Sequence, residues 1–173
     1  MSSQPDTPNF AQRGIRLIMA TRPVTWVLAR TFHHIDAAAF RASGGRTTAG
    51  ALLSGLPLIT LTTTGAKSGR PRTVTLVGIP DGERIILIAS NWGQANNPAW
   101  YHNVRANPEV KVLLGGRGRD VPAERHYTAR ELAGAERELA WARAVALYPG
   151  YRGYAARTNG RTIPVIALEP GEV

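Results

Sequence analysis

The sequence has 173 residues, a length that fits one domain with a single hydrophobic core. It contains no cysteine, which excludes disulfides, thiolate nucleophiles and cysteine-ligated metal sites, so redox chemistry here needs a bound cofactor. The formal net charge of +9 predicts a surface that attracts anions such as nucleic acid, acidic lipid headgroups or a phosphorylated ligand.

The first third of the chain predicts two segments. Residues 1–12 are polar and are expected to be a disordered lead. Residues 13–56 are expected to be helical, because apolar residues recur at helical spacing from Val24 to Phe40 after Pro23. This helix packs on the domain's own core or lies on a membrane surface, and the sequence leaves both possibilities open. Because arginines interrupt its apolar runs, no signal peptide is expected and a cytoplasmic location is predicted.

Residues 57–173 predict one folded domain in which strands dominate the first part. Runs rich in Ile, Leu, Val and Thr alternate with turn signals, and Pro80 to Glu83 predict a hairpin that makes its two flanking strands antiparallel neighbours. A glycine-rich turn at 115–118 predicts a second strand pair. The predicted strands are 58–64, 73–79, 84–90, 109–114, 119–127 and 163–168.

Two helices are predicted between these strands. Asn97-Pro98 is typical of a helix start and Asn107-Pro108 of a helix end. Thr128 and Glu131 have the spacing of a capping box, which predicts a helix from Thr128 to about Leu147. Strands joined mainly by hairpins, with helices at one end, indicate an antiparallel sheet or small barrel of the α+β class.

The turn between the first two predicted strands, residues 62–72, carries the strongest chemical signal. Its glycines allow positive φ, so that successive amides can point at one anion, and Lys67, Arg70 and Arg72 would surround that point. Charge-assisted hydrogen bonds of this kind contribute about 1.5–3 kcal/mol each, enough for phosphate binding. The spacing is not that of a Walker loop, and a solvated basic hairpin tip remains the alternative.

Two further stretches are candidates for a binding site. Ser90, Asn91 and Trp92 follow a strand end, and Trp100 with Tyr101 opens the next helix, which together would suit a planar heteroaromatic ligand. Ordinary packing of the helix on the sheet is the alternative for these rings.

The second of these stretches carries three tyrosines, Tyr148, Tyr151 and Tyr154. Pro149 and two glycines among them predict a turn or a lid over a pocket, and a tyrosine cluster that closes the core is the alternative.

Metal and hydrolytic chemistry are not supported by the sequence. The four histidines, His33, His34, His102 and His126, form no i, i+4 pair, so no metal is predicted. Neither a GxSxG elbow nor a GxGxxG turn after a strand occurs.

The order of these motifs resembles a known family. Between Leu58 and Pro170 the chain reads LTTTGAKSGRPRTVTL, DGERIILIASNWG, NPAWYHNVRANPEV, YPGYRGY and RTIPVIALEP. These motifs resemble the deazaflavin-dependent nitroreductases and F420H2-dependent quinone reductases. The resemblance implies an antiparallel split β-barrel like those of flavin reductases and pyridoxamine oxidases, and coenzyme F420, an 8-hydroxy-5-deazaflavin with a phosphate and an oligoglutamate tail.

The resemblance also implies roles for particular residues. The anionic tail would lie on the basic turn, the ring along the second strand, and the acceptor beneath the three tyrosines. For cofactor binding it implies Lys67, Ser68, Gly69, Arg70, Arg72, Thr73, Val74, Thr75, Val77, Ala89, Ser90, Asn91 and Trp100. For catalysis it implies Ser90, Tyr148, Tyr151 and Tyr154. Of these, the hydroxyls of Ser90 and Tyr151 would stabilise charge on the reduced oxygen.

The implied activity is hydride transfer from F420H2 to a quinone, a nitroaromatic or another electron-poor acceptor. The family often has other residues at Ala66, Thr75 and Val77, which leaves nitroimidazole reduction open. The basic N-terminal helix predicts peripheral contact with an anionic membrane that holds lipid quinones, and a monomer or weak dimer is expected. One alternative is a split barrel that binds FMN, either as an enzyme or as a carrier without activity. The other is a basic barrel that binds nucleic acid, although this sequence lacks the aromatics alternating with cations along a strand that such a barrel would use.

Overall fold

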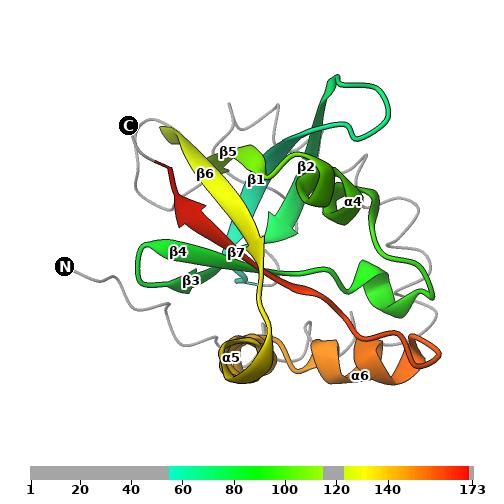
Figure 1. The fold of residues 1–173 in the computed structure, drawn as a ribbon. Coiled ribbons are helices and arrows are strands. Elements are labelled where there is room, and N and C mark those ends of the chain that lie inside the picture. Colours follow the sequence, from blue (N-terminus) through cyan, green and yellow to red (C-terminus); the bar gives the residue numbers. More distant parts are fainter. Residues whose placement is uncertain (1–54, 115–122, 172–173) are drawn as a thin grey trace.

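The computed structural model describes residues 55–114 and 123–171, whose strands form one antiparallel seven-stranded sheet in the order β2-β1-β5-β6-β7-β4-β3 (Figure 1). The predicted lead and N-terminal helix, and the glycine-rich turn at 115–118, lie outside the described residues. The elements are β1 (Leu58–Thr64), β2 (Pro71–Val77), β3 (Ile79–Asp81), β4 (Arg84–Ile88), the 3-10 turn η1 (Asn91–Gly93), α4 (Ala99–Ala106), β5 (Glu109–Leu114), β6 (Ala123–Glu131), α5 (Gly134–Leu147), α6 (Gly150–Arg157) and β7 (Val165–Pro170).

The sheet curls into a half-barrel because β2 and β3, which are consecutive in the chain, lie at its opposite edges. Gly78 joins them at a tight corner, where an added Cβ would lie 2.6 Å from a methyl of Ile59 and 3.0 Å from one of Ile85. The expected pairing of 73–79 with 84–90 is therefore wrong. Only β3 pairs with β4, and β2 pairs with β1 instead.

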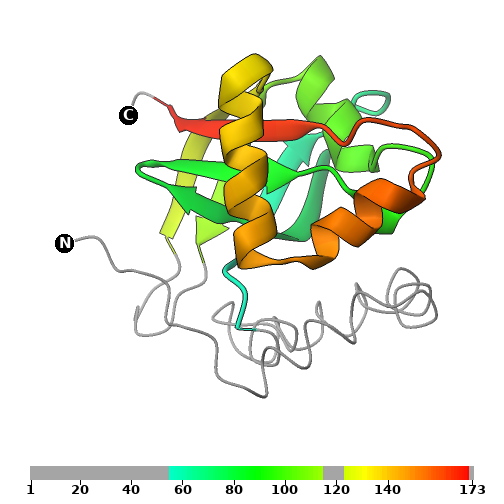
Figure 2. The ribbon, with the colours of Figure 1, turned by 90° about the horizontal axis from the view of Figure 1, so that it is seen from below.

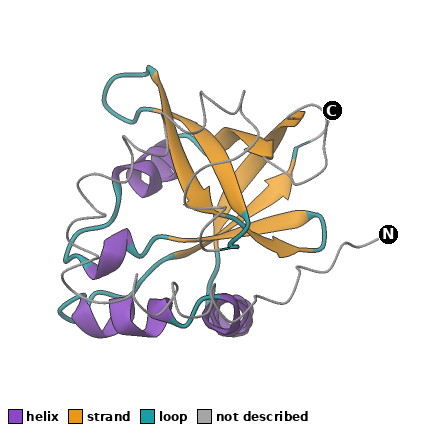
Figure 3. Ribbon diagram, turned by 180° about the vertical axis from the view of Figure 1, so that it is seen from behind, coloured by secondary structure: helices purple, strands orange, loops and turns teal. Residues whose placement is uncertain are grey.

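Each face of the sheet has its own hydrophobic cluster. The concave face packs on α4 and holds side chains of every strand except β3, with Leu61, Leu87 and Val112 fully buried. The other face packs on α5 and α6. Figure 2 shows α5 crossing the sheet and α6 continuing beside it, and Figure 3 shows the helices gathered at one end of the strands. The predicted α+β split barrel is thus confirmed.

The helix boundaries correct two expectations. The helix α4 begins at Ala99, with Pro98 rather than Asn97 as its N-cap, and ends at Ala106 with Asn107 as its C-cap, as predicted from Asn107-Pro108. The capping box at Thr128–Glu131 does not start a helix, because β6 continues to Glu131, which pairs with Ile166 of β7. Thr128 Oγ1 instead donates to Glu109. The strand continues four residues beyond its predicted end at 127. The backbone hydrogen bonds that it gains with β7 over these residues stabilise the strand more than the capping motif would stabilise a helix.

An ion-pair network holds α5 against the sheet. Arg84 binds Asp81 at 2.6 Å and Glu136 at 2.7 Å, while Arg130 binds Glu136 at 3.1 Å and Glu169 at 2.8 Å. Hydrogen bonds from Arg130 and then Arg84 lower the pKa of the Glu136 carboxyl to about 2. Among the helices that the structure describes, none has the length and apolarity needed to cross a bilayer.

Candidate functional site

The basic turn between β1 and β2 is held in place by hydrogen bonds within the protein. The Gly65 amide donates to Arg70 O at 2.9 Å, and the Gly69 amide, at φ of 64°, donates to Gly65 O at 2.8 Å. Asn103 on α4 accepts from the Ala66 amide at 3.0 Å and donates to the Thr63 hydroxyl at 3.0 Å. Two strands and a helix therefore position this turn (Figure 1).

These bonds define which groups of the turn are available to a ligand. The Gly69 amide, one of those implied for anion binding, is used inside the turn, whereas the amides of Lys67 and Ser68 donate to no described residue. Lys67, Arg70 and Arg72 are exposed, and none of the three is ion-paired within residues 55–114 and 123–171. The turn thus presents three cations and two amides to solvent.

The strand that follows the turn, β2, has an open edge. It pairs only with β1, so one row of its backbone N–H and C=O groups has no strand partner in the described sheet. Val74 packs into the concave cluster, which also holds Ala89 and Trp100, whereas Thr73 and Thr75 lie on the opposite face. The structure therefore brings β2, the end of β4 and the start of α4 together. Val77 packs instead against the cluster of α5 and α6.

The segment after β4 has an unusual backbone. Asn91 and Trp92 have φ of 47° and 57°, a left-handed conformation that is uncommon for non-glycine residues and costly for a bulky one such as Trp92. The Asn91 side chain donates to Asn96 O at 2.9 Å. The Ser90 hydroxyl makes no hydrogen bond to any described residue, which leaves it available to a ligand.

Arg161, in the loop after α6, fixes this segment. Its guanidinium donates to Asn97 Oδ1 at 2.6 Å, Gln94 O at 2.9 Å, Ser90 O at 3.0 Å and Ala89 O at 3.3 Å. Burial lowers the pKa of Arg161 below the usual guanidinium value. The sequence assigned no role to Arg161 or to Asn103, because the residues that each side chain bonds lie far from it in the chain.

The three tyrosines are packed inside the protein. Tyr148, at the end of α5, and Tyr151 and Tyr154, in α6, are only 5%, 5% and 2% exposed. The predicted turn is wrong, since residues 150–157 form a helix, and the packing is that of the alternative, a tyrosine cluster closing the core. Trp92 lies edge-on to Tyr154, with ring centroids 6.1 Å apart, so the cluster adjoins the segment that follows Ser90.

The tyrosine hydroxyls differ in their partners. Those of Tyr148 and Tyr154 are 3.0 Å apart, within hydrogen-bond distance of each other. The Tyr151 hydroxyl makes no hydrogen bond to a described residue, and burial, followed by the charge of ionised Tyr148, raises its pKa. Tyr151 is therefore a neutral O–H donor at physiological pH, and its hydroxyl, unlike the other two, makes no hydrogen bond within the described residues.

Several known proteins are similar to this chain in sequence and in fold. Residues 32–170 match the family described as F420H(2)-dependent quinone reductase. The F420H(2)-dependent quinone reductase Rv1261c of Mycobacterium tuberculosis is 44% identical over 59 residues, 34% of this chain and 40% of that relative. Rv3178 of the same species is 34% identical over 115 residues, 66% of this chain and 91% of the relative. A solved structure of an F420-H2 dependent reductase (FDR-A) is 43% identical, with a TM-score of 0.55 over 65% of this chain and 94% of that one.

The fold and the basic turn define a split-barrel protein with an exposed basic hairpin beside an open strand edge. The chain belongs to the F420H(2)-dependent quinone reductase family, whose model covers most of its length. The predicted family is thereby confirmed. The match to Rv1261c spans only 40% of that relative's length.

Proposed function

We propose that this chain is an oxidoreductase that uses reduced coenzyme F420 to reduce a quinone or another electron-poor acceptor. Family membership and the printed names of its relatives support this proposal. The observation that carries it is the turn at residues 65–70, whose exposed cations have no carboxylate partner in the described chain. Such a turn suits a ligand with a phosphate and several carboxylates.

The residues of the turn fit the anionic part of F420. Lys67, Arg70 and Arg72 would bind the phosphate and the oligoglutamate tail, and the free amides of Lys67 and Ser68 would donate to the phosphate oxygens. Ala66 stands where the family often has arginine, and Arg70 would supply the cation in its place. Because these side chains are exposed, binding is expected to weaken as salt rises.

The ring would lie beside the open edge of β2. The backbone groups of Thr73, Thr75 and Val77 face the open edge and can bond the polar edge of a planar heterocycle, whereas Val74, whose backbone pairs with Leu61, would contribute its side chain. Ala89, Ser90 and Asn91 would line its other side, with Trp100 supporting the wall between them. This position is supported by the packing of Val74, Ala89 and Trp100 in one cluster.

Bound F420H2 supplies a hydride, and a deazaflavin, which has carbon in place of N5, avoids one-electron chemistry with oxygen. The protein's part is to position donor against acceptor and to stabilise charge on the acceptor oxygen. The hydroxyls of Ser90 and Tyr151 would donate to that oxygen. Tyr148 and Tyr154 would shape the acceptor site and hold Tyr151, because their own hydroxyls bond each other.

The test is stoichiometric F420H2 with menadione, followed by the absorbance of the oxidised deazaflavin, beside binding titrations with F420, FMN and FAD. We expect turnover, and tightest binding by F420. Changing both Lys67 and Arg72 to Met should raise the Kd for F420 about tenfold, whereas Arg152→Met, at an exposed position of α6, should not. Preference for FMN would replace the cofactor assignment, and absence of both turnover and binding would refute the proposal.

Two finer assignments belong to the same proposal. Nitroaromatics are candidate acceptors, and Thr75 and Val77, where the family often has proline and an aromatic, would decide whether nitroimidazoles fit. Contact with anionic membranes would come from the basic N-terminal segment. Deleting residues 1–45 should then reduce binding to anionic vesicles, and unchanged binding would exclude this contact.

A further inference from the structure

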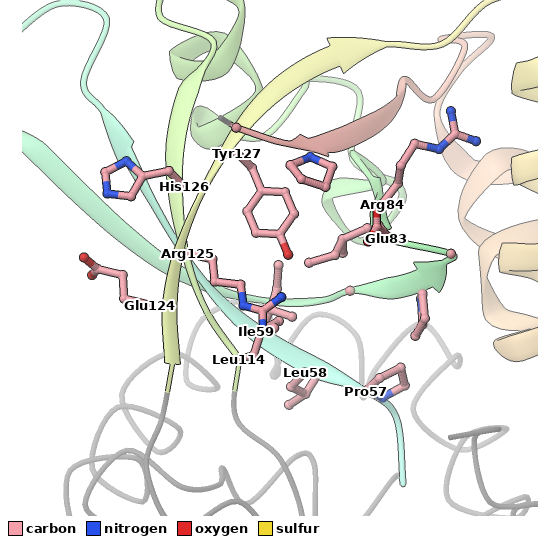
Figure 4. A pocket seen from close by; sticks show the side chains of 16 residues that line it. Pro57, Leu58, Ile59, Glu83, Arg84, Leu114, Glu124, Arg125, His126 and Tyr127 are labelled. Carbon is pink, nitrogen blue, oxygen red and sulfur yellow. The ribbon is translucent and has the colours of Figure 1, made fainter. Parts of the chain in front are cut away.

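A cavity of about 1,100 Å³ opens at the end of the barrel opposite to the basic turn. It lies at the start of β1, whereas the turn follows the end of β1, about 20 Å away at 3.3 Å per strand residue. The basic turn proposed for the anionic tail of F420 therefore lies at the other end of β1, whereas Leu58 and Gly78 of the cavity lining adjoin Val77 of the proposed ring site. Its lining residues are Pro57, Leu58, Ile59, Gly78, Pro80, Gly82, Glu83, Arg84, Ile85, Leu114, Glu124, Arg125, His126, Tyr127, Pro170 and Gly171 (Figure 4).

The alternation of β6 decides which side chains enter this cavity. Arg125 and Tyr127 pair with Val112 and Val110, whose side chains lie in the concave core, so both belong to the inward row of β6. Figure 4 shows both side chains extending into the cavity, while Glu124 and His126 point away on the outer side. The cavity is thus an end of the barrel interior that the described side chains leave open, with a tyrosine and an arginine in it.

Tyr127 is a largely buried side chain, 3% exposed, whose hydroxyl makes no hydrogen bond to any described residue. Figure 4 shows that hydroxyl directed into the cavity. The oxygen itself is not among the fully buried polar atoms that lack a partner, so it is open to the cavity, where a ligand or water can accept its hydrogen bond.

Arg125 is the cation of the same inward row, two residues from Tyr127. It is an exposed residue whose side chain extends into the cavity, and no described carboxylate pairs with it. Arg84, the other arginine of the lining, is already bound by Asp81 and Glu136.

The acidic groups of the lining do not compete for Arg125. Glu124 accepts from Lys111 at 3.1 Å on the outer face, and Glu83 lies across the cavity in the β3–β4 turn. The polar side chains that β6 directs into the cavity are therefore a guanidinium and a phenol, both of which can donate. A donor pair of this kind is matched by an anionic acceptor.

We propose that this end of the barrel binds an amphipathic organic anion. Its carboxylate or phosphate head would accept hydrogen bonds from Arg125 and Tyr127, and its apolar body would lie against Ile59, Ile85 and Leu114. The site does not depend on the proposed reductase activity. Binding at the barrel end would be a second function of the protein. The ligand would carry one negative charge and be no larger than a drug-sized molecule.

The probes are 1-anilinonaphthalene-8-sulfonate and N-phenyl-1-naphthylamine, which share an aromatic body and differ in the anionic group. Fluorescence titration of the full chain should show that Arg125→Met raises the Kd of the anionic probe about tenfold and leaves that of the neutral probe unchanged. Tyr127→Phe should raise the anionic probe's Kd several-fold. Arg152→Met is the matched control, an exposed arginine on α6, and should change neither value. Melting curves establish that each variant is folded.

Equal affinities of wild type and both variants for the anionic probe would overturn the proposal, as would parallel losses for the two probes. Displacement by decanoate, decyl phosphate and decanol then identifies the head group, with the alcohol expected to compete least. Equal competition by the alcohol would also refute an anion site. F420 binding should stay unchanged in Arg125→Met, so failure of this proposal and failure of the reductase assignment are distinguishable.

Discussion

Replacing Arg161 by methionine tests whether one arginine organises the site. The substitution keeps an apolar stem and removes the donors to Asn97, Gln94, Ser90 and Ala89. Three of these acceptors are backbone carbonyls, at 2.9, 3.0 and 3.3 Å, and the contact with the Asn97 side chain at 2.6 Å is the shortest of the set. Water can replace the guanidinium at exposed Gln94 but less readily at buried Ala89. We therefore expect a loss of about 2–4 kcal/mol in the free energy of unfolding.

That loss corresponds to a fall of roughly 4–16 °C in Tm for a domain of this size, measurable by calorimetry or circular dichroism. The Kd for F420 should rise about tenfold, because the backbone before the strained Asn91–Trp92 step no longer has a fixed position. Arg161→Lys, which keeps the charge but not the planar set of donors, should recover part of the stability. Arg152→Met serves as the control on α6. An Arg161→Met variant with wild-type Tm and wild-type affinity would refute the role assigned to this residue.

Three other substitutions or conditions give separate tests. Gly93→Ala should cost about 2–5 kcal/mol by urea unfolding, because Gly93 has φ of 78° and an added Cβ would lie 2.9 Å from Tyr154 O, whereas Gly82→Ala, at φ of 66° in open space, should cost only the backbone part. Equal losses would refute the tight packing of η1 on α6. Glu136→Gln should lower Tm at pH 7, since the folded-state pKa lies below the ordinary 4.5; the difference from wild type should shrink as pH falls from about 4.5 toward 2, and a constant difference would contradict the ion-pair network. Because burial raises the pKa of Tyr151, the rate of quinone reduction should show no loss from tyrosine ionisation below about pH 10, and a rate that falls with a lower pKa in wild type but not in Tyr151→Phe would disprove a neutral donor.

Local chemistry explains the elements that the sequence predicted well. The strand at 58–64 and the turn at Gly82 follow from β-branched runs and from a glycine at positive φ, which neighbouring residues alone can specify. The basic turn was likewise visible in the chain, because its glycines and its cations lie within eight residues. The order of these motifs was enough to indicate the family.

Contacts between distant segments decided the rest. The capping box at Thr128 was overridden because β6 gains pairing with β7 along its last residues. The strand run at 73–79 splits at Gly78, because packing against Ile59 and Ile85 takes place only when the sheet curls. Folding likewise brings together the groups that bind Arg161, the side chains that bury the tyrosines, and the described residues that line the open barrel end beside Tyr127. Local propensities act over a few residues, whereas hydrogen-bond partners and cavities are set by closure of the whole sheet, which no short stretch of sequence determines.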